Sequence, residues 1–457
     1  MSDTTIKSIT DFAVATTFSS IPAAVRHDCT RRLIDTLACA LAAYNEIPCR
    51  IARDLALRVN VPDGAYILGT TVRTLPELAA FANGVMARYL DGNDAYPGGG
   101  GHPSDMLAAI LAAANICRSD GKAFITAMTV AYETFYAFRQ AACMRERGMD
   151  HVFYTAVGSA IGAARIMSLD EKRFAEAISL AVTPNIALHA TRRGELSMWK
   201  GCAAGNAARN GVFAALLASK GMTGPDHPIE GSHGLRELVG EFEFPDLPGA
   251  DVPFRLTEAQ MKYFLAESHS HAPITAALEL HRRVAAEEIE AVTIHTYWFA
   301  WHEIGSEREK WRPTTRETAD HSMPYIVAAV LIDGRFGDDL FSIERLRDER
   351  ILQLADRISI EEDPELSRQF PAKYPCRIEI RTRSGNTLVA SVDHPRGHFR
   401  NPMTDEEVSA KFRVLAGRVL SSSHVERALD WLWKLDEAAD LDPLFEMLAI
   451  DTGKAAA

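Results

Sequence analysis

The sequence predicts a mainly α protein with a smaller α+β domain, and three changes of pattern along its 457 residues carry that prediction. Apolar residues recur at helical spacing from Ile6 to about Gly221. After about residue 265, short segments alternate between apolar and polar residues, as half-buried strands do. From about residue 400 the helical spacing returns. We therefore expect a large all-helical domain formed by residues 1–265 and 400–457, with an α+β lid domain of residues 266–399 inserted between its two parts.

The predicted helices of the first part share apolar residues spaced three and four apart, and Gly, Pro or Asp interrupts the chain between them. Many are also rich in alanine and glycine, which lets neighbouring helices approach closely. We interpret their apolar stripes as core positions rather than as parts of a site. The helices are expected over Thr30–Ala43, Leu75–Tyr89, Met106–Cys117, Ala123–Ala142, Thr155–Met167 and Asn206–Lys220.

Alternating segments mark the inserted α+β part. Residues Ile289–Tyr297 alternate like one half-buried strand. Two further segments, Cys376–Arg383 and Thr387–Asp393, flank Ser384-Gly-Asn386, which predicts a hairpin with its turn residues in place. Helices are expected here over His271–Ala286 and Met323–Leu331, and in the C-terminal part over Thr404–Val419 and Val425–Leu435.

The net charge of −12, from 49 Lys and Arg against 61 Asp and Glu, argues against a nucleic-acid binder, because phosphate contacts need a basic face. It argues more weakly against an acidic substrate, since repulsion slows the encounter. The segment Val182–Ala215 reverses the sign locally, because it holds four cations and one glutamate. A positive segment of this kind suits carboxylate groups.

Cysteine usage and hydropathy predict a cytoplasmic protein that does not contact a membrane. Seven cysteines are scattered without a C-x-x-C pair, so reduced thiols are expected rather than a disulfide framework or a zinc finger. The first residues, MSDTTIKSITDFAVATTF, lack a basic region followed by an apolar core, and no signal peptide is predicted. No apolar run is long enough to span a bilayer.

The segment from Leu90 to Asp105 (LDGNDAYPGGGGHPSD) follows one predicted helix and precedes another. Asp91, Asp94 and His102 could converge on one pocket, where a carboxylate would orient the imidazole for acid–base work. The alternative is a surface turn with two capping aspartates, since Gly and Asp are common in turns. The glycines match neither a dinucleotide-binding nor a P-loop motif.

A second segment, Thr191–Gly201 (TRRGELSMWKG), leads into the predicted helix that is rich in small residues. Arg192, Arg193 and Lys200 could bind carboxylates there, together with N–H donors at the helix end. The alternative is a basic loop paired with surface acids, because exposed charges are usually solvated.

Two histidines precede predicted helices. His151 follows Asp150 ahead of a Gly- and Ala-rich helix, and a structural role is the alternative to a catalytic one. The segment His321–Tyr325 (HSMPY) places a histidine and a tyrosine before an apolar helix, with helix capping as the alternative.

Titratable groups also gather near the predicted domain junction, where Lys262 is followed by Glu267, His269 and His271. His269 and His271 would point apart on a helix, because residues two apart do not share a face. The pair His302-Glu303 starts like a zinc-binding H-E-x-x-H motif, but a serine stands where the second histidine is required. No metal site is therefore expected.

Several blocks of sequence occur in the order found in one known family. They are Asp91–Asp94 (DGND) with Gly101–Asp105 (GHPSD), Arg192–Ala204 (RRGELSMWKGCAA), Gly221–Pro225 (GMTGP), Thr318–Ser322 (TADHS) and Asp333-Gly334. The chain resembles the MmgE/PrpD family along essentially its whole length, and the GELSMWKG and GHPSD blocks are the most specific. That family includes 2-methylcitrate dehydratase, cis-aconitate decarboxylase and iminodisuccinate epimerase.

The resemblance implies a helical domain built from both termini, an α+β lid, an active site between them and usually a homodimer. It also implies cofactor-free chemistry on small di- or tricarboxylates. Matched motif by motif, it places the catalytic pocket at Asp91, His102, His151, Lys200, Lys262 and Tyr325. The candidate substrate-binding residues are Arg192, Arg193, Asp94, His269 and His271, and His271 stands where many members carry glutamine.

We therefore expect a cofactor-independent lyase that dehydrates 2-methylcitrate or a citrate-like acid to the aconitate-type alkene. Such a reaction needs a base, an acid for the leaving oxygen and cations for the carboxylates, and His102 and His151 titrate in the right range. Decarboxylation of cis-aconitate or epimerisation of a related acid needs much the same groups and stays open. A non-catalytic carboxylate-binding protein is the alternative of a different class, although such a protein would not need both histidines together with Lys200 and Lys262.

Overall fold

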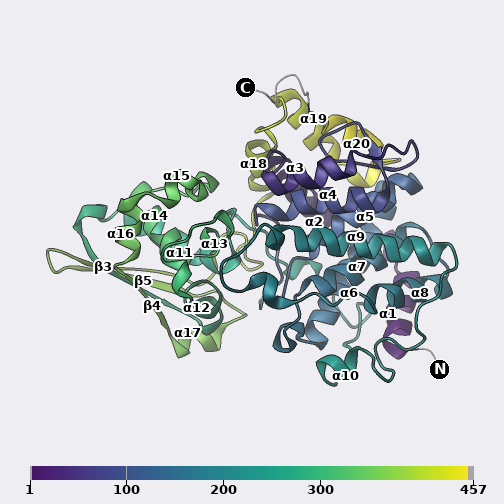
Figure 1. Ribbon diagram of the computed structural model, residues 1–457, viewed down its shortest axis with the longest axis horizontal. Coiled ribbons are helices and arrows are strands. Elements are labelled where there is room, and N and C mark those ends of the chain that lie inside the picture. Colours follow the sequence, from purple (N-terminus) through teal and green to yellow (C-terminus); the bar gives the residue numbers. More distant parts are fainter. Residues whose placement is uncertain (1–2, 99, 451–457) are drawn as a thin grey trace.

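The computed structural model describes residues 3–98 and 100–450, and these form two parts that lie side by side (Figure 1). The helical part has one large hydrophobic core, which draws residues from Ile6–Leu265 and again from Met403–Leu448. The second part has its own core, built from residues between Ala266 and Ala390. The predicted fold class, mainly α with an inserted α+β part, is confirmed. We call the parts the helical domain and the α+β domain; the boundaries at residues 265 and 400 stay a prediction.

The helices of the helical domain come from both ends of the chain. In the described ranges they are α1 (Thr4–Ala15), α2 (Ala23–Ala42), α3 (Ile47–Ala56), α4 (Pro76–Tyr89), α5 (Leu107–Cys117), α6 (Gly121–Ala141), α7 (Val152–Ile166), α8 (Glu171–Val182), α9 (Trp199–Ser219), α10 (Leu235–Val239), α18 (Asp405–Ala416), α19 (Ser422–Leu432) and α20 (Asp442–Met447). The short strands β1 (Ala65–Tyr66) and β2 (Arg73–Thr74) pair between α3 and α4. Helix α18 packs on α2, so the C-terminal segment completes the domain that the N-terminal segment begins (Figure 1).

Helix α9 packs against α4, α7 and α8 in the helical domain. The close contact with α4 requires glycine, because a Cβ on Gly205 would lie 2.7 Å from the carbonyl oxygen of Phe81. The predicted helix from Asn206 starts too late, since α9 begins at Trp199. Glycines lower the intrinsic helix propensity of residues 201–205, and packing against α4 overrides that preference. The earlier start places Lys200 in the first turn of α9.

The α+β domain is built on a four-stranded sheet with the order β4-β3-β5-β6. Its strands are β3 (Ile289–Thr296), β4 (Ile358–Glu362), β5 (Cys376–Thr382) and β6 (Thr387–Val392). The predicted hairpin is confirmed, because β5 and β6 pair antiparallel with Cys376 opposite Val392. Strand β4, which the sequence pattern does not predict, runs parallel to β3, with Val292 opposite Ile358. Its pairing depends on a long crossover through several helices, so its five residues carry little local signal.

The helices of the α+β domain connect and cover this sheet (Figure 1). They are α11 (His271–His281), α12 (Trp298–Ile304), α13 (Arg316–Ala319), α14 (Met323–Asp333), α15 (Ile343–Leu346), α16 (Glu349–Ala355) and α17 (Pro364–Gln369). Helix α11 packs against β5, β6 and α14, so the apolar α14 is buried behind it. Within residues 3–98 and 100–450, no helix combines the length and the apolar character that crossing a bilayer requires.

Candidate active site

A cavity of about 270 Å³ lies between the two domains and is lined by side chains from both. Its volume is near the lower end of the range for small-molecule sites, about 300–1,000 Å³. The charged and histidine side chains in its lining are Arg88, Asp91, His102, Arg139, Arg145, His151, His189, Arg192, Glu267, His269, Glu303, Lys310 and His321. The cavity therefore fits a small polar molecule, and proton-transfer groups surround it.

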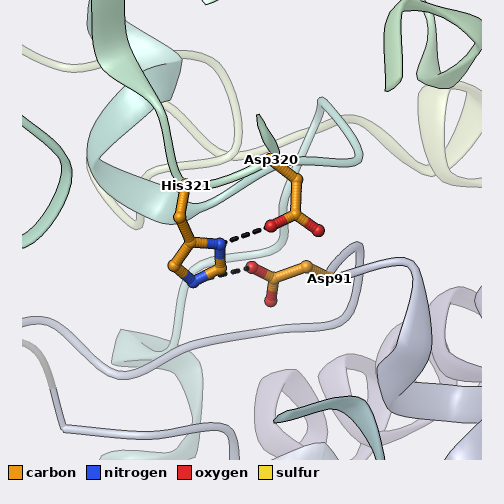
Figure 2. Close-up of side chains that lie close together, drawn as sticks. All are labelled: Asp91, Asp320 and His321. Carbon is orange, nitrogen blue, oxygen red and sulfur yellow. Dashed lines mark hydrogen bonds and ion pairs between the residues drawn. The ribbon is translucent and has the colours of Figure 1, made fainter. Parts of the chain in front are cut away.

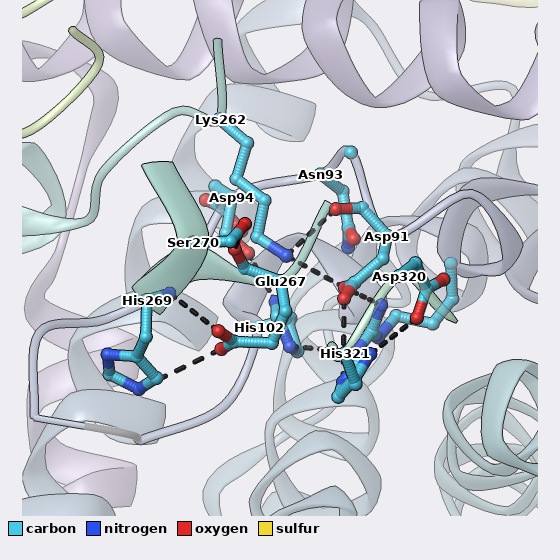
Figure 3. A network of polar contacts seen from close by, with 12 residues as sticks. Asp91, Asn93, Asp94, His102, Lys262, Glu267, His269, Ser270, Asp320 and His321 are labelled. Carbon is cyan, nitrogen blue, oxygen red and sulfur yellow. Dashed lines mark hydrogen bonds and ion pairs between the residues drawn. The ribbon is translucent and has the colours of Figure 1, made fainter. Parts of the chain in front are cut away.

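Asp91 is the centre of a buried ion-pair cluster in one wall of this cavity (Figure 3). It follows α4 with φ 52°, a left-handed conformation that Asp adopts more readily than most residues. Lys262 Nζ lies 2.7 Å from its Oδ1, Lys200 Nζ lies 3.5 Å from its Oδ2, and Arg88 also donates to Oδ1. Burial alone would raise the pKa of Asp91, but the three cations hold it well below its usual range. Asp91 thus remains ionised and fixes these cations.

Asp320 and His321 extend the cluster from the α+β domain (Figure 2). The Asp320 carboxylate accepts a hydrogen bond from His321 Nδ1, and His321 Nε2 lies 3.8 Å from Asp91 Oδ2. Oxygen and nitrogen atoms of the three residues lie within 4.8 Å of one another, as metal ligands could. Lys200 Nζ, however, lies 3.5 Å from Asp91 Oδ2 and 3.4 Å from Asp320 Oδ1. An ammonium group already bridges the two carboxylates, so these residues suit a lysine better than a metal ion.

His102 is held as a neutral imidazole in the lining of the cavity. Its Nδ1 donates to the carbonyl oxygen of Asp94 at 2.6 Å, which leaves Nε2 to accept a hydrogen bond from Arg88 Nη2 at 2.9 Å. Burial, together with the nearby charges of Arg88 and Lys262, lowers the pKa of His102 well below its ordinary value. Because both nitrogens are engaged, His102 orients Arg88 in this arrangement and holds no free lone pair for a substrate proton.

His151 has the opposite arrangement, because one of its nitrogens is free. Asp150 Oδ1 lies 3.0 Å from His151 Nδ1, and Asp150 Oδ2 accepts from Arg192 Nε at 2.9 Å. Within the described part of the chain, the buried atoms His151 Nε2 and Arg192 Nη2 have no hydrogen-bond partner. Burial lowers the pKa of His151 to about 3 and outweighs the neighbouring carboxylate. A single carboxylate therefore orients a proton acceptor and a cationic donor in the lining of one cavity.

Glu267 and His269 bring two more titratable groups from the segment that enters the α+β domain. Glu267 lines the cavity, and its Oε2 accepts the backbone N–H of His269 at 2.6 Å (Figure 3). Burial raises the pKa of Glu267 and outweighs the nearby charges of His321 and Lys262. His269 stacks on Tyr374 with ring centres 5.4 Å apart, and its Nδ1 contacts the hydroxyl of Tyr297. Glu267 is thus the lining carboxyl group best suited to carry a proton.

The charges in the lining favour an anion. Five arginine and lysine side chains face three carboxylates, and Asp91 is already compensated by the cluster behind it. Arg145 pairs with Glu303 across the two domains, and Arg139 donates to the carbonyl oxygen of Gly98 at 2.5 Å. The cavity is therefore locally cationic on a chain whose net charge is −12, and of the four cations in the segment 182–215 it is Arg192 that lines it.

The structure brings some of the predicted site residues to the cavity and leaves others away from it. Those that line it are Asp91, His102, His151, Arg192 and His269. Lys200 and Lys262 are buried behind Asp91 and contact the cavity through its carboxylate. Asp94 does not line the cavity, because Arg32, Tyr132 and the Ser104 N–H use its carboxylate. It supports His102 through its carbonyl oxygen.

Two further predicted substrate-binding residues, besides Asp94, lie outside the cavity. Arg193 is 45% exposed at its side chain and lies 3.5 Å from Glu307 of the α+β domain, outside the cavity. His271 is buried at the start of α11, where its ring packs on Phe264 with centres 5.4 Å apart. Neither side chain is placed to contact a molecule in the cavity, so both assignments are corrected.

The structure contradicts the predicted catalytic role of Tyr325, which lies away from the cavity. It is fully buried in the core of the α+β domain, and its hydroxyl donates to the carbonyl oxygen of Leu340 at 2.7 Å. Tyr325 points into the core because it lies within α14, which is buried. His321 precedes the helix cap Ser322 and lines the cavity. The segment His321–Tyr325 (HSMPY) therefore contributes His321 to the site instead of Tyr325.

Replacing Tyr325 with phenylalanine is expected to change stability and leave turnover intact. The variant loses one buried hydrogen bond and leaves the Leu340 carbonyl without its donor, which costs about 1–3 kcal/mol of unfolding free energy. Urea unfolding and steady-state kinetics check the two expectations separately. A fall in kcat without a change in stability would restore Tyr325 to the catalytic set.

Four residues of the observed site are absent from the predicted catalytic and substrate-binding residues. They are Arg88, Glu267, Asp320 and His321. Arg88 lies three residues before Asp91 at the end of α4, the spacing at which helical ion pairs form, and this signal could have identified it. The sequence holds four Asp-His pairs, at 150–151, 226–227, 320–321 and 393–394, and the cavity lining includes the histidines of the first and third. The dipeptide alone therefore does not identify His321 as a residue of the site.

The buried histidines give stability a measurable pH dependence. Burial lowers the pKa of His271 to about 3, against an ordinary value of 6.5 in the unfolded chain. Stability gained from its neutral form is fully present above pH 6.5 and is lost as the pH falls towards 3, because the unfolded chain then binds the extra proton. His271→Gln should reduce the slope of unfolding free energy against pH by about 1.4 kcal/mol per pH unit in that window.

Denaturant unfolding between about pH 3.5 and pH 7, which spans this window, measures the slope. His233 is the matched control, because its side chain is 95% exposed and His233→Gln should leave the slope unchanged. Equal slopes for the wild type and His271→Gln would show that His271 is protonated in the folded protein.

The fold and the cavity together define a class of two-domain proteins, in which both ends of the chain build a helical domain and an inserted α+β domain closes a cavity rich in imidazoles and cations. Two family models match the chain: the MmgE/PrpD N-terminal domain matches residues 7–244, and the MmgE/PrpD C-terminal domain matches residues 264–437. The chain belongs to the MmgE/PrpD family.

Relatives with assigned names resemble the chain over most of its length. A 2-methylcitrate dehydratase of Cupriavidus necator is 30% identical over 83% of this chain and 83% of its own. The 2-methylcitrate dehydratase of Salmonella typhimurium is 30% identical over 87% of both chains. The cis-aconitate decarboxylase of Mus musculus is 25% identical over 82% of this chain and 79% of its own. These names are those of lyases.

Proposed function

We propose that the protein is a cofactor-independent lyase that dehydrates a small tricarboxylate, 2-methylcitrate or a citrate-like acid, to the aconitate-type alkene. One observation carries the proposal: Asp150 orients both His151 and Arg192, two residues of the same cavity lining, whose atoms Nε2 and Nη2 have no hydrogen-bond partner among the described residues. Dehydration removes a proton next to a carboxylate, and this pair supplies a proton acceptor beside a carboxylate-binding cation. The names of the two bacterial relatives support the same reaction.

The proton acceptor in this proposal is His151 Nε2. Its lowered pKa of about 3 keeps it unprotonated at neutral pH, and a bound anion raises its affinity for a proton as the reaction proceeds. Asp150 stabilises the imidazolium that forms, because its Oδ1 lies 3.0 Å from Nδ1. Arg192, Arg139 and Arg145 hold the substrate carboxylates and the negative charge that develops on one of them.

The proton donor in this proposal is Glu267, which protonates the hydroxyl group as it leaves as water. Burial raises the pKa of this carboxyl group, and a raised pKa keeps the proton available at a higher pH than an exposed glutamate allows. Glu267 comes from the α+β domain and His151 from the helical domain, so the reaction needs both domains in contact. The bridging position of Lys200 supports an ammonium rather than a metal ion beside the site.

The name of the mouse relative makes decarboxylation of cis-aconitate the second candidate. Incubating chelator-treated protein with 2-methylcitrate, citrate, cis-aconitate and iminodisuccinate, and recording alkene absorbance, released carbon dioxide and optical rotation, separates the reactions. Alkene formed from a hydroxy acid supports the dehydratase proposal. Carbon dioxide from cis-aconitate alone would replace it with a decarboxylase. Binding by calorimetry without any turnover would identify a carboxylate-binding protein.

A further inference from the structure

The C-terminal helix α18 extends one buried lysine to the rear of the site. Lys411 Nζ donates to Asp35 Oδ1 at 2.6 Å, to the carbonyl oxygen of Gly92 at 2.8 Å and to the carbonyl oxygen of Lys262 at 2.7 Å. An ammonium group has three donors, so all of them are used. The side chain is 8% exposed and does not line the cavity. Lys411 therefore contacts the backbone of the site and leaves its reacting atoms untouched.

The two carbonyl groups belong to the segments that carry the central ion pair. Gly92 follows Asp91 directly, and Lys262 is the residue whose Nζ lies 2.7 Å from Asp91 Oδ1 and 2.8 Å from the Asp91 carbonyl oxygen. Asp91 and Lys262 contact each other, and Lys411 holds the backbone next to each of them. Asp35, on α2, neutralises the ammonium group, so the anchoring point is a rigid helix.

Close packing around Gly92 restricts the conformation of the loop that follows α4. A Cβ on Gly92 would lie 2.2 Å from Leu265 Cδ2 and 3.0 Å from Cys39 Sγ, so neighbouring side chains enclose this backbone closely. Asp91 itself is in the left-handed region with φ 52°. Such a conformation persists only where the surroundings fix it. The Lys411 hydrogen bond to the very next carbonyl group is one of the contacts that does so.

We propose that Lys411 is a positioning residue of the active site: its ammonium group joins the Gly92 and Lys262 backbones and thereby sets the position of the Asp91–Lys262 pair. The inference rests on the proposed function, because it assigns the pair a part in turnover. It also gives the C-terminal segment, which contributes no side chain to the cavity lining within the described residues, a direct role in the site.

Lys411→Met tests the proposal by removing the three donors at similar side-chain length. We expect kcat to fall by roughly 100-fold, as small misplacements of site groups do, while KM changes by less than about threefold. KM is preserved because the carboxylate-binding arginines of the cavity lie on other segments. Lys411→Met also leaves Asp35 buried without its partner, so a second variant is needed. Asp35→Asn/Lys411→Met removes that charge and should recover thermal stability but not kcat.

Ser409→Ala is the matched control, because Ser409 lies on the same helix, is also buried and bonds only Trp433, at 3.1 Å, through its side chain within the described residues. It should keep wild-type kcat. Recovery of kcat in Asp35→Asn/Lys411→Met would overturn the proposal, since only the charge imbalance would then have mattered. A rise in KM at constant kcat would overturn it as well.

Amide hydrogen exchange separates this inference from the proposed function. Peptides covering residues 88–96 and 259–266 should exchange faster in Asp35→Asn/Lys411→Met than in the wild type or Ser409→Ala, whatever the substrate is. Unchanged exchange in both peptides would refute the positioning role. A wild-type protein inactive on all four acids would refute the lyase, while the exchange result would still decide whether Lys411 orders these segments.

Discussion

Replacing Asp91 with asparagine should destabilise the protein by about 3–5 kcal/mol and abolish turnover. Arg88, Lys200 and Lys262 are each buried and each contact this carboxylate, so the variant leaves buried cations without their main partner. Asparagine tolerates the left-handed conformation at φ 52°, so the effect is electrostatic and not a consequence of backbone strain. Urea unfolding at neutral pH measures the loss of stability, and substrate turnover measures the loss of function.

The pH dependence of this destabilisation provides an internal check. The pKa of Asp91 is held well below its usual range, so its stabilisation is fully present above the unfolded pKa of about 3.9 and is lost as the pH falls through the folded value. The gap in unfolding free energy between wild type and Asp91→Asn should therefore be constant at neutral pH and narrow at the acid end. A gap that widened in acid would contradict this ion-pair account.

Asp11→Asn is a suitable control for removing a carboxylate. Asp11 lies 2.6 Å from Lys7 in an exposed helical pair, and surface pairs of this kind contribute little. We expect no measurable change in its unfolding midpoint. If Asp91→Asn also unfolded at the wild-type midpoint, a lysine of the cluster would have to lose its proton in the variant. Burial already favours the neutral form at Lys262, because it lowers the pKa of that lysine.

The pattern of the sequence predicts the fold class and the hairpin of β5 and β6, because both depend on spacing that is local to the chain. Strand β4 and the first turns of α9 depend instead on partners far away in sequence. Ile358 pairs with Val292 through a crossover, and Gly201 and Gly205 lie in α9 where it packs closely on α4. Tertiary packing decided these elements, and no local spacing records it.

The site residues also divide into those that local sequence predicts and those that depend on distant partners. Asp91, His102 and His151 stand beside Gly, Pro or Asp in distinctive motifs, and the structure brings all three to the cavity. The sequence places both His321 and Tyr325 before an apolar helix, and the family resemblance selects Tyr325. Only the burial of α14 shows that His321 is the residue at the cavity. Lys411 lies 376 residues from Asp35, so nothing in either segment predicts their contact.

Replacing His151 with glutamine should lower kcat by about 10²–10⁴-fold, the usual contribution of a positioned general base. The glutamine side chain would still fill the space beside His102, whose ring centre lies 5.4 Å from that of His151, and Arg192 keeps its bond to Asp150. Substrate binding should therefore persist. Calorimetry of the variant with the acid that the wild type turns over measures the retained affinity, and single-turnover kinetics measure the lost chemistry.

Asp150→Asn tests whether the carboxylate acts through the imidazole. Asparagine cannot stabilise the imidazolium at Nδ1, so kcat should fall by less than in His151→Gln but by a clearly measurable factor. If the two residues act as a unit, Asp150→Asn/His151→Gln should be no slower than His151→Gln alone. If the fold-decreases in kcat of the two single variants multiply in the double variant, Asp150 acts in catalysis mainly through Arg192, its second partner. A full kcat in His151→Gln would remove His151 as the base and transfer that role to His321, which has the same Asp-His arrangement on the opposite domain.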